Sequence, residues 1–175
     1  MHNGEAGGDQ QVPAARDAEG AEDREGGILI MRYAYPCQVT LHEGHEFVVS
    51  FPDVPGALTG ANDRAEALEL AADALSVMLA GYVKDRKAIP VPSPALDGQE
   101  IVAVDPVMAA KLELYSTMRE QGVTKNALAE RLGLSDTTVG RLTDPGRRSH
   151  IGSVARALQA VGRGLVIEGR ANPVR

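Results

Sequence analysis

The side chains with the clearest chemical use lie near the carboxyl end of the chain. Arg141 carries a planar guanidinium group, which can bond to two acceptors on the edge of a guanine base. Thr137 can contact a thymine methyl group or a phosphate, and Asp136 can either accept from a cytosine amino group or only favour the start of a helix. The adjacent pair Arg147 and Arg148 suits phosphate contacts, which add affinity but no choice of sequence. Together these residue types indicate a DNA ligand.

Reading bases requires that such side chains stand on an exposed helix that a second helix holds in place. Residues 124–143 have the spacing of a helix-turn-helix, in which two short helices pack across a tight turn. Ala129 is small enough for close approach, Gly133 permits a positive φ in the turn, and Ser135 can cap the second helix. The apolar contacts would come from Leu128, Leu132, Leu134, Val139 and Leu142. The spacing predicts a helix-turn-helix, and an ordinary helical hairpin that binds nothing is the alternative.

The polar and basic residues of this region form the predicted DNA-binding set. They are Lys125, Ser135, Asp136, Thr137, Thr138, Arg141, Arg147, Arg148, Ser149 and His150. Residues 125–175 hold nine basic and four acidic residues, a net charge of +5, whereas the whole chain has a net charge of −6. Residues 28–98 hold nine acidic and five basic residues, a net charge of −4, so the two parts suit different partners. One helix-turn-helix reads only half of a site, and we therefore expect a homodimer or a higher even oligomer.

Patterns for catalysis or metal binding are weak in this sequence. Cys37, His42 and His45 lie close together, but alternation places Cys37 on an apolar strand face, and the chain has no other cysteine to complete a zinc site. A nuclease would need several carboxylates that converge on Mg²⁺, and nothing in the spacing of the nearby acids demands this. Those acids are Glu43, Glu46 and Asp53. We expect no catalytic residue, no enzyme activity, no metal and no cofactor.

The first patterned part of the chain predicts a small sheet with one helix. The expected strands are residues 33–41, 46–51, 57–61 and 101–104, with a turn at 43–45. The apolar face of the first strand holds Tyr33, Tyr35, Cys37, Val39 and Leu41. A helix capped by Asn62 or Asp63 should run to about Val83. Its apolar stripe holds Leu68, Ala71, Ala72, Leu75, Met78, Leu79 and Tyr82. The prolines of residues 89–98 predict an extended linker.

From about residue 106 the pattern is helical. A helix is expected over residues 107–121, and Gly122 should end it. One face of this helix holds Val107, Ala110, Leu114 and Met118. A last helix has the apolar stripe Ile151, Val154, Ala155, Leu158 and Val161. Residues 165–168 are predicted to form a short strand.

These patterns predict an α+β chain in three parts. Residues 1–30, rich in Gly, Ala, Asp and Glu, form a disordered leader whose removal should change neither stability nor binding. Residues 31–105 form a small antiparallel sheet with one helix, and residues 106–175 form an all-α helix-turn-helix domain. The lone cysteine cannot form an internal disulfide, and no apolar run approaches the ~20 residues of a membrane span. We expect a cytoplasmic protein with no membrane partner.

Two stretches of the sequence contain a recognisable series of motifs. The first consists of Tyr35-Pro36, the string 47–56 that ends in Phe51-Pro52-Asp53-Val54-Pro55-Gly56, then Ala65-Glu66-Ala67-Leu68 and Ile89-Pro90-Val91-Pro92-Ser93. The second consists of Ala109-Ala110-Lys111-Leu112, residues 128–133 and Leu142-Thr143-Asp144-Pro145. The first stretch resembles HicB-type antitoxins, the partners of HicA-type toxins, and the second is similar to members of that family that carry a helix-turn-helix. The resemblance covers about residues 32–168, and the chain departs from it at Ala57, where members often have cysteine.

This resemblance implies a partial ribonuclease-H-like fold without nuclease activity for residues 31–105. That domain would bind and neutralise a small basic ribonuclease, the HicA-type toxin, while the second domain represses the shared operon by binding operator DNA. The resemblance assigns no toxin-binding residue, and residues 51–56 are better interpreted as a structural loop than as a toxin contact. Two alternatives stay open: a stand-alone transcriptional repressor whose first domain senses a small ligand, and an active nuclease.

Overall fold

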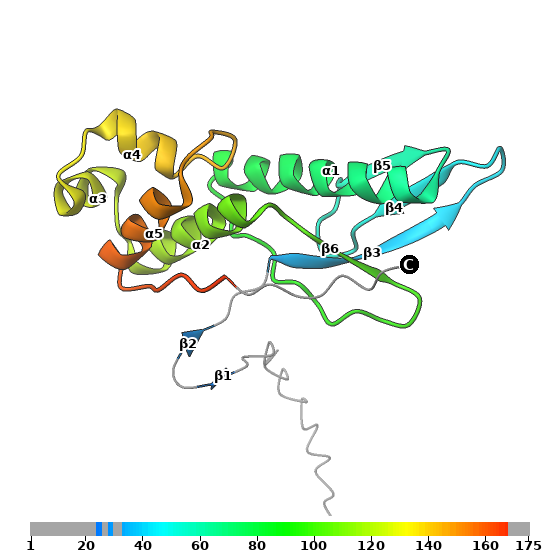
Figure 1. Ribbon diagram of the computed structural model, residues 1–175, viewed down its shortest axis with the longest axis horizontal. Helices are drawn as coiled ribbons and strands as arrows, with labels where there is room; N and C mark the ends of the chain where they lie inside the picture. The colour runs from blue at the N-terminus through cyan, green and yellow to red at the C-terminus, as the bar shows by residue number, and fades with distance from the viewer. Residues whose placement is uncertain (1–23, 26–27, 30–32, 168–175) are drawn as a thin grey trace, which may run out of the picture.

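The computed structural model describes residues 24–25, 28–29 and 33–167, and its elements form two groups joined by one helix (Figure 1). Two short strands, β1 (Arg24–Glu25) and β2 (Ile28–Leu29), pair antiparallel ahead of both groups. The predicted leader, residues 1–30, otherwise lies outside the described residues. No helix in the described part of the chain is long and apolar enough to cross a membrane.

The first group is an antiparallel sheet of four strands, which confirms the predicted α+β class and strand positions. The strands are β3 (Ala34–Leu41), β4 (Phe47–Ser50), β5 (Leu58–Ala61) and β6 (Glu100–Ala103). Their order in the sheet is β5-β4-β3-β6, so β3 is central and the last strand in sequence returns to its free edge. The hairpin between β3 and β4 turns at Gly44 and His45, whose φ values are 105° and 70°. The first of these is a conformation in which glycine costs little.

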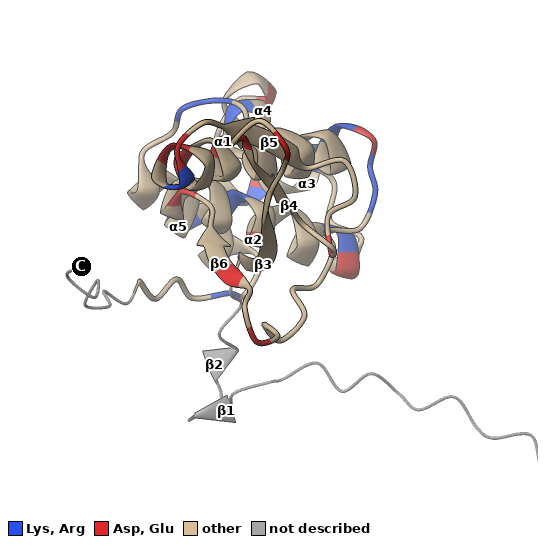
Figure 2. Ribbon diagram, turned by 90° about the vertical axis from the view of Figure 1, so that its right-hand side faces the viewer, with Lys and Arg blue, Asp and Glu red and all other residues tan. Residues whose placement is uncertain are grey.

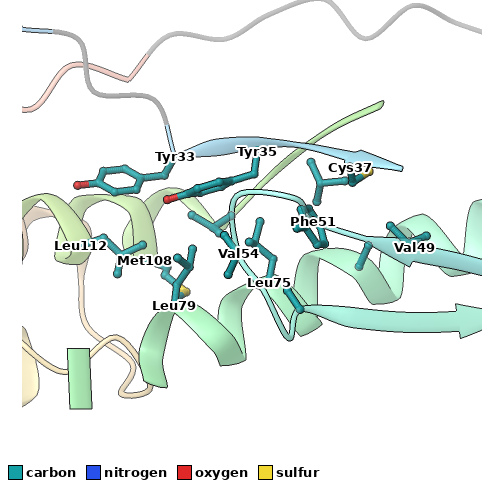
Figure 3. Close-up of a cluster of buried hydrophobic side chains, with 14 of the residues drawn as sticks. Tyr33, Tyr35, Cys37, Val49, Phe51, Val54, Leu75, Leu79, Met108 and Leu112 are labelled. Carbon is teal, nitrogen blue, oxygen red and sulfur yellow. The ribbon is translucent and has the colours of Figure 1, made fainter. Parts of the chain in front are cut away.

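One long helix, α1 (Arg64–Lys84), covers one face of the sheet (Figure 1). The Asp63 carboxylate caps it by accepting from the backbone N–H groups of Ala65 and Glu66. The helix buries Ala67, Ala71, Leu75 and Leu79. These residues pack against Tyr35, Cys37, Val49 and Phe51 from the sheet side (Figure 3). The prediction that the Leu41 side chain lies on this buried face is wrong. Leu41 is 58% exposed, because it ends β3 beside the hairpin turn.

The proline-rich segment, residues 89–98, does not separate the two groups. It contains no helix or strand, as predicted, but it joins α1 to β6 and so lies within the sheet region. The Tyr35 hydroxyl donates to the Pro90 carbonyl at 2.8 Å. Asp53 accepts from both the backbone N–H and the hydroxyl of Ser93, at 2.9 and 3.0 Å. The segment is therefore an extended strap bound to the sheet region, since polar groups along it find partners there.

The second group consists of short helices, and its core is wholly aliphatic apart from methionine. The helices are α2 (Pro106–Gln121), α3 (Lys125–Leu132), α4 (Asp136–Leu142) and α5 (Ile151–Ala160). Their core includes Ala110, Leu114, Met118, Leu128, Val139, Val154, Ala157 and Leu158. The strand predicted for residues 165–168 is wrong over its described part: residues 165–167 form no strand, and Val166 and Ile167 are exposed without a neighbouring strand.

Helix α2 belongs to both cores. Its predicted apolar face packs into the helical core, while Met108 and Leu112 on another face join the sheet core (Figure 3). Three polar contacts add to this attachment. The Tyr33 hydroxyl donates to Glu113 Oε2 at 3.1 Å, the Tyr115 hydroxyl donates to the Lys87 carbonyl at 2.7 Å, and Arg119 Nη1 donates to the Arg86 carbonyl at 2.7 Å. The two groups are therefore packed on a common helix, as Figure 1 shows.

Candidate nucleic-acid interface

The pair α3 and α4 is held by local signals that the sequence displays. The Thr124 hydroxyl caps α3 by accepting from the backbone N–H of Ala127 at 3.1 Å. Gly133 ends α3 in the left-handed region, with φ 62° and ψ 35°. Ser135 then caps α4 by accepting from the N–H of Thr138 at 3.3 Å. Three residues thus separate the two helices, and each end of the turn is satisfied by a hydrogen bond.

The contact between these helices matches the expected roles of their small and apolar residues. Ala129 is 5% exposed, and its carbonyl accepts from the N–H of Leu134 at 3.0 Å across the turn. Leu128 and Val139 are fully buried. Both α3 and α4 also contact α5, so the pair rests on a fixed support. The outward side of α4 is consequently presented on a packed scaffold.

Most of the predicted DNA-binding residues are exposed, and they fall into two kinds. Ser149 is half-buried, and the other nine are exposed. The hydroxyls of Ser135 and Thr138 lie 3.0 Å apart and serve the cap of α4. The Ser149 hydroxyl also bonds locally, because it donates to the Arg141 carbonyl at 3.4 Å. Among the described residues, no hydrogen bond or ion pair joins the side chain of Thr137 or Arg141 to a neighbour. These two side chains are thus available to a ligand, while the hydroxyls of Ser135, Thr138 and Ser149 serve the fold.

Three of the predicted residues line one hollow at the surface of α4. Thr137, Arg141 and Arg147 lie around a cavity of about 290 Å³. Gly140 and Asp144 complete its lining, and Arg147 Nε lies 3.8 Å from Asp144 Oδ2. The absence of a side chain at Gly140 leaves space between the polar groups. Two guanidinium groups and a hydroxyl around such a hollow provide donors suited to a phosphate or to the edge of a base.

A larger hollow, of about 710 Å³, lies between the loop that follows α4 and the helices α1 and α2. Arg147, Arg148, Ser149 and His150 from the predicted set line one side of it. The other side is formed by Ser76 of α1 and by the start of α2, with Asp105, Val107 and Met108. Arg147 lines both hollows, whereas Lys125 at the start of α3 lines neither. Figure 2 marks basic positions beside α4 and one acidic position on β6, which is Glu100.

The predicted DNA-binding set does not include Lys111, which the structure places beneath this site. It comes from α2, is fully buried, and its Nζ donates to the carbonyl groups of Arg141, Asp144 and Arg147. Burial lowers the pKa of its ammonium group, and the Asp144 carboxylate partly opposes this. The signal in the sequence is a lysine four residues after Val107 and three before Leu114, within the apolar stripe of α2.

The weaker candidate sites are placed apart from this region. Cys37 lies in the sheet core, where burial raises the pKa of its thiol, while His42 and His45 are exposed beside the hairpin turn. Asp53 bonds to Ser93. Across the residues that the structure describes, no group of three or more His, Cys, Asp or Glu side chains is arranged to hold a metal ion.

Comparison with known proteins identifies the family. The sequence model described as "HicB_like antitoxin of bacterial toxin-antitoxin system" matches residues 34–113. Antitoxin HicB 1 of Photorhabdus laumondii is 34% identical over 140 residues, which cover 80% of this chain and 89% of that protein. The chain belongs to the HicB antitoxin family. Antitoxin HicB of Escherichia coli K12 is 33% identical over 131 residues (75% of this chain, 95% of that protein), and that of Pseudomonas fluorescens is 36% identical over 143 residues (81% and 95%).

Membership makes this HicB-like chain the antitoxin of a toxin–antitoxin pair, with a toxin as its partner. The family match begins with β3 and ends within α2, at Glu113. It thus includes Met108 and Leu112, the two α2 residues of the sheet core. The alignments with whole relatives are longer than this match, since they span 131–143 residues. Similarity therefore extends beyond the sheet region.

Proposed function

We propose that this antitoxin neutralises a HicA-type ribonuclease toxin with its sheet region and represses its own operon with α3 and α4, in the bacterial cytoplasm. In this proposal α3 and α4 form a helix-turn-helix, and α4 is the recognition helix. The sheet region is a partial ribonuclease-H-like fold that has lost nuclease activity, and the chain is not an enzyme.

The main support for the proposed DNA binding is the hollow around Thr137, Arg141 and Arg147. It lies on the outward side of a capped helix that is packed from behind, which is what base reading requires. In this arrangement Arg141 bonds to a guanine edge. Arg147 and Arg148, in the loop after α4, hold phosphates.

The division of charge supports two separate partners. Residues 28–98 have a net charge of −4, and residues 125–175 a net charge of +5. An acidic surface speeds encounter with a basic toxin and disfavours DNA, while a basic surface does the reverse. A homodimer, or a higher even oligomer, would place two copies of α4 about 34 Å apart for a two-part operator.

The test uses the whole chain with the protein encoded by the adjacent open reading frame. Co-expression should rescue growth from that protein, and the two should co-purify. The chain should also shift a duplex from the region upstream of its own gene more strongly than a random duplex of equal length. Failure of both growth rescue and co-purification would contradict the proposed toxin neutralisation. Equal binding of both duplexes would contradict the proposed recognition of an operator.

The alternative of a stand-alone repressor is set aside by the family membership, because an antitoxin has a toxin as its partner. The hollow of about 710 Å³ favours only a response to a small ligand in addition to the antitoxin role, since Arg147, Arg148 and Met108 line it. A ligand there would bear directly on the DNA-contacting loop, so it should change operator binding by the purified chain.

A further inference from the structure

Lys111 occupies an unusual place for a charged side chain. Among the described residues it is the only buried charged side chain, and none of its surface is exposed. It donates to the Arg141 carbonyl at 2.9 Å, to the Asp144 carbonyl at 2.8 Å and also to the Arg147 carbonyl. An ammonium group has three donors, so all of them are used.

The three acceptors belong to the segment that carries the arginines of the smaller hollow. Arg141 lies in the last turn of α4, where unpaired carbonyl groups carry partial negative charge. Asp144 and Arg147 are the two ends of the next turn, since the N–H of Arg147 donates to the Asp144 carbonyl at 3.1 Å. One ammonium group therefore joins the end of the recognition helix to both ends of the turn after it.

Core stability alone does not call for a lysine at this position. Removing an ammonium group from water is costly, and well-packed apolar residues in place of buried ions are often neutral or stabilising. Burial accordingly lowers the pKa of Lys111. What an apolar residue cannot supply is a common bonding point for three carbonyl groups. The lysine thus fixes positions that hydrophobic packing would leave free.

We propose that Lys111 is a positioning residue for DNA recognition: from α2, it sets the backbone of Arg141 and Arg147 so that both guanidinium groups face the same hollow. This inference rests on the proposed DNA-binding function. It makes α2 the element that sets the DNA-contacting loop as well as the element shared by the two cores.

The test is a double-mutant cycle on the full chain. Lys111→Met keeps the length of the side chain but removes its donors, and it is combined with Arg141→Ala. The control is Leu112→Ala, which alters the next residue of α2, in the sheet core. Binding to the upstream duplex is measured at a temperature where thermal melts show every variant folded. In the wild type, Arg141→Ala should weaken binding by about tenfold, as expected for a bidentate base contact.

In the Lys111→Met background, the same Arg141→Ala change should cost about twofold or less, because Arg141 no longer faces its base. In the Leu112→Ala background it should still cost about tenfold. An equal cost of Arg141→Ala in all backgrounds would overturn the positioning role. If Lys111→Met melts below the assay temperature, Lys111→Gln replaces it, since its amide can bond to two of the carbonyls and should give intermediate coupling.

Unfolding of both Lys111 variants while Leu112→Ala stays folded would make Lys111 a residue of general stability and would also overturn the proposal. A wild type that does not prefer the upstream duplex would instead remove the proposed operator reading itself. The two failures are therefore distinguishable.

Discussion

The sheet region and the helical region differ in how their structure is specified. The sheet core contains Tyr33, Tyr35, Phe51 and Cys37 and depends on pairings between distant segments, such as β3 with β6. The helical core has no aromatic residue, and α2 and α3 each begin at a side-chain cap and end at a glycine. Residues of the loop after α4 line both hollows, and α4 itself lines the smaller one. The difference indicates that the ends of α2 and α3 are set by local signals, whereas the sheet region is held by long-range contacts.

The two regions are nevertheless expected to unfold together, because α2 contributes to both cores. Leu75→Ala in the sheet core and Leu158→Ala in the helical core each remove a fully buried leucine. Each should lower the free energy of unfolding by about 2–5 kcal/mol. Urea unfolding can be followed by tyrosine fluorescence, which reports the sheet region and α2, and by helical circular dichroism.

With both probes, each variant should show one coincident transition at a lower midpoint. Two separate transitions, with Leu158→Ala moving only the helical one, would mean that the regions are independent domains.

The next largest effect concerns DNA, and it should appear in the helical region alone. Arg141→Ala should weaken operator binding by about 1–3 kcal/mol and relax the base preference at one position. Arg156→Ala is a matched control, because it removes the same charge from an exposed position of α5 that lines neither hollow. Titrations on operator and random duplexes at one salt concentration make the measurement. Equal losses on both duplexes for Arg141→Ala would contradict a base-reading role.

Two glycines of the helical region allow the cost of strain in a left-handed turn to be compared with the gain from higher helix propensity. Gly133 has a φ of 62° and open space where a side chain would lie, so Gly133→Ala should cost about 1–2 kcal/mol from backbone strain alone. Gly152 is helical and equally open, so Gly152→Ala should raise stability by roughly 0.5–1 kcal/mol. Chemical denaturation of the two variants checks both signs. A loss at Gly152, or none at Gly133, would show that the local account of these helices is wrong.

The smallest expected effects compare one cap in each region. Asp63→Ala removes the cap of α1, and Ser135→Ala removes the cap of α4. Each should cost about 1 kcal/mol in the free energy of unfolding. Only Ser135→Ala should also weaken operator binding, since it loosens the start of the recognition helix. If operator binding falls equally for both variants, the loss of binding would be caused by lower stability of the whole fold and not by a change in α4.

Much of the fold was predictable because its signals are local. The hairpin at residues 43–45, the cap at Asp63, Gly122 and Gly133 as helix ends, and Ser135 as a cap all lie where the sequence indicates. The features that were missed depend on distant partners. Residues 89–98 have the composition of a linker, and only Tyr35 and Asp53 make them a bound strap.

The candidate site shows the same limit. Exposure of Arg141 and Arg147 followed from their helix and loop, since apolar neighbours are buried on the opposite side. The bonds of Lys111 could not be foreseen, because they join α2 to carbonyl groups 30 to 36 residues later. A lysine within an apolar stripe signals only that some partner must exist. Which partner it finds is a property of the tertiary structure.

Toxin neutralisation and DNA binding should be separable activities of this one chain, and a single strain can test this. Arg141→Ala and Arg147→Ala are introduced together into the full chain, which is expressed with the adjacent protein and a reporter behind the upstream promoter. Repression should be lost while growth rescue remains at the wild-type level, because both arginines lie in the helical region. Loss of growth rescue by a folded double variant, or repression that persists, would contradict it.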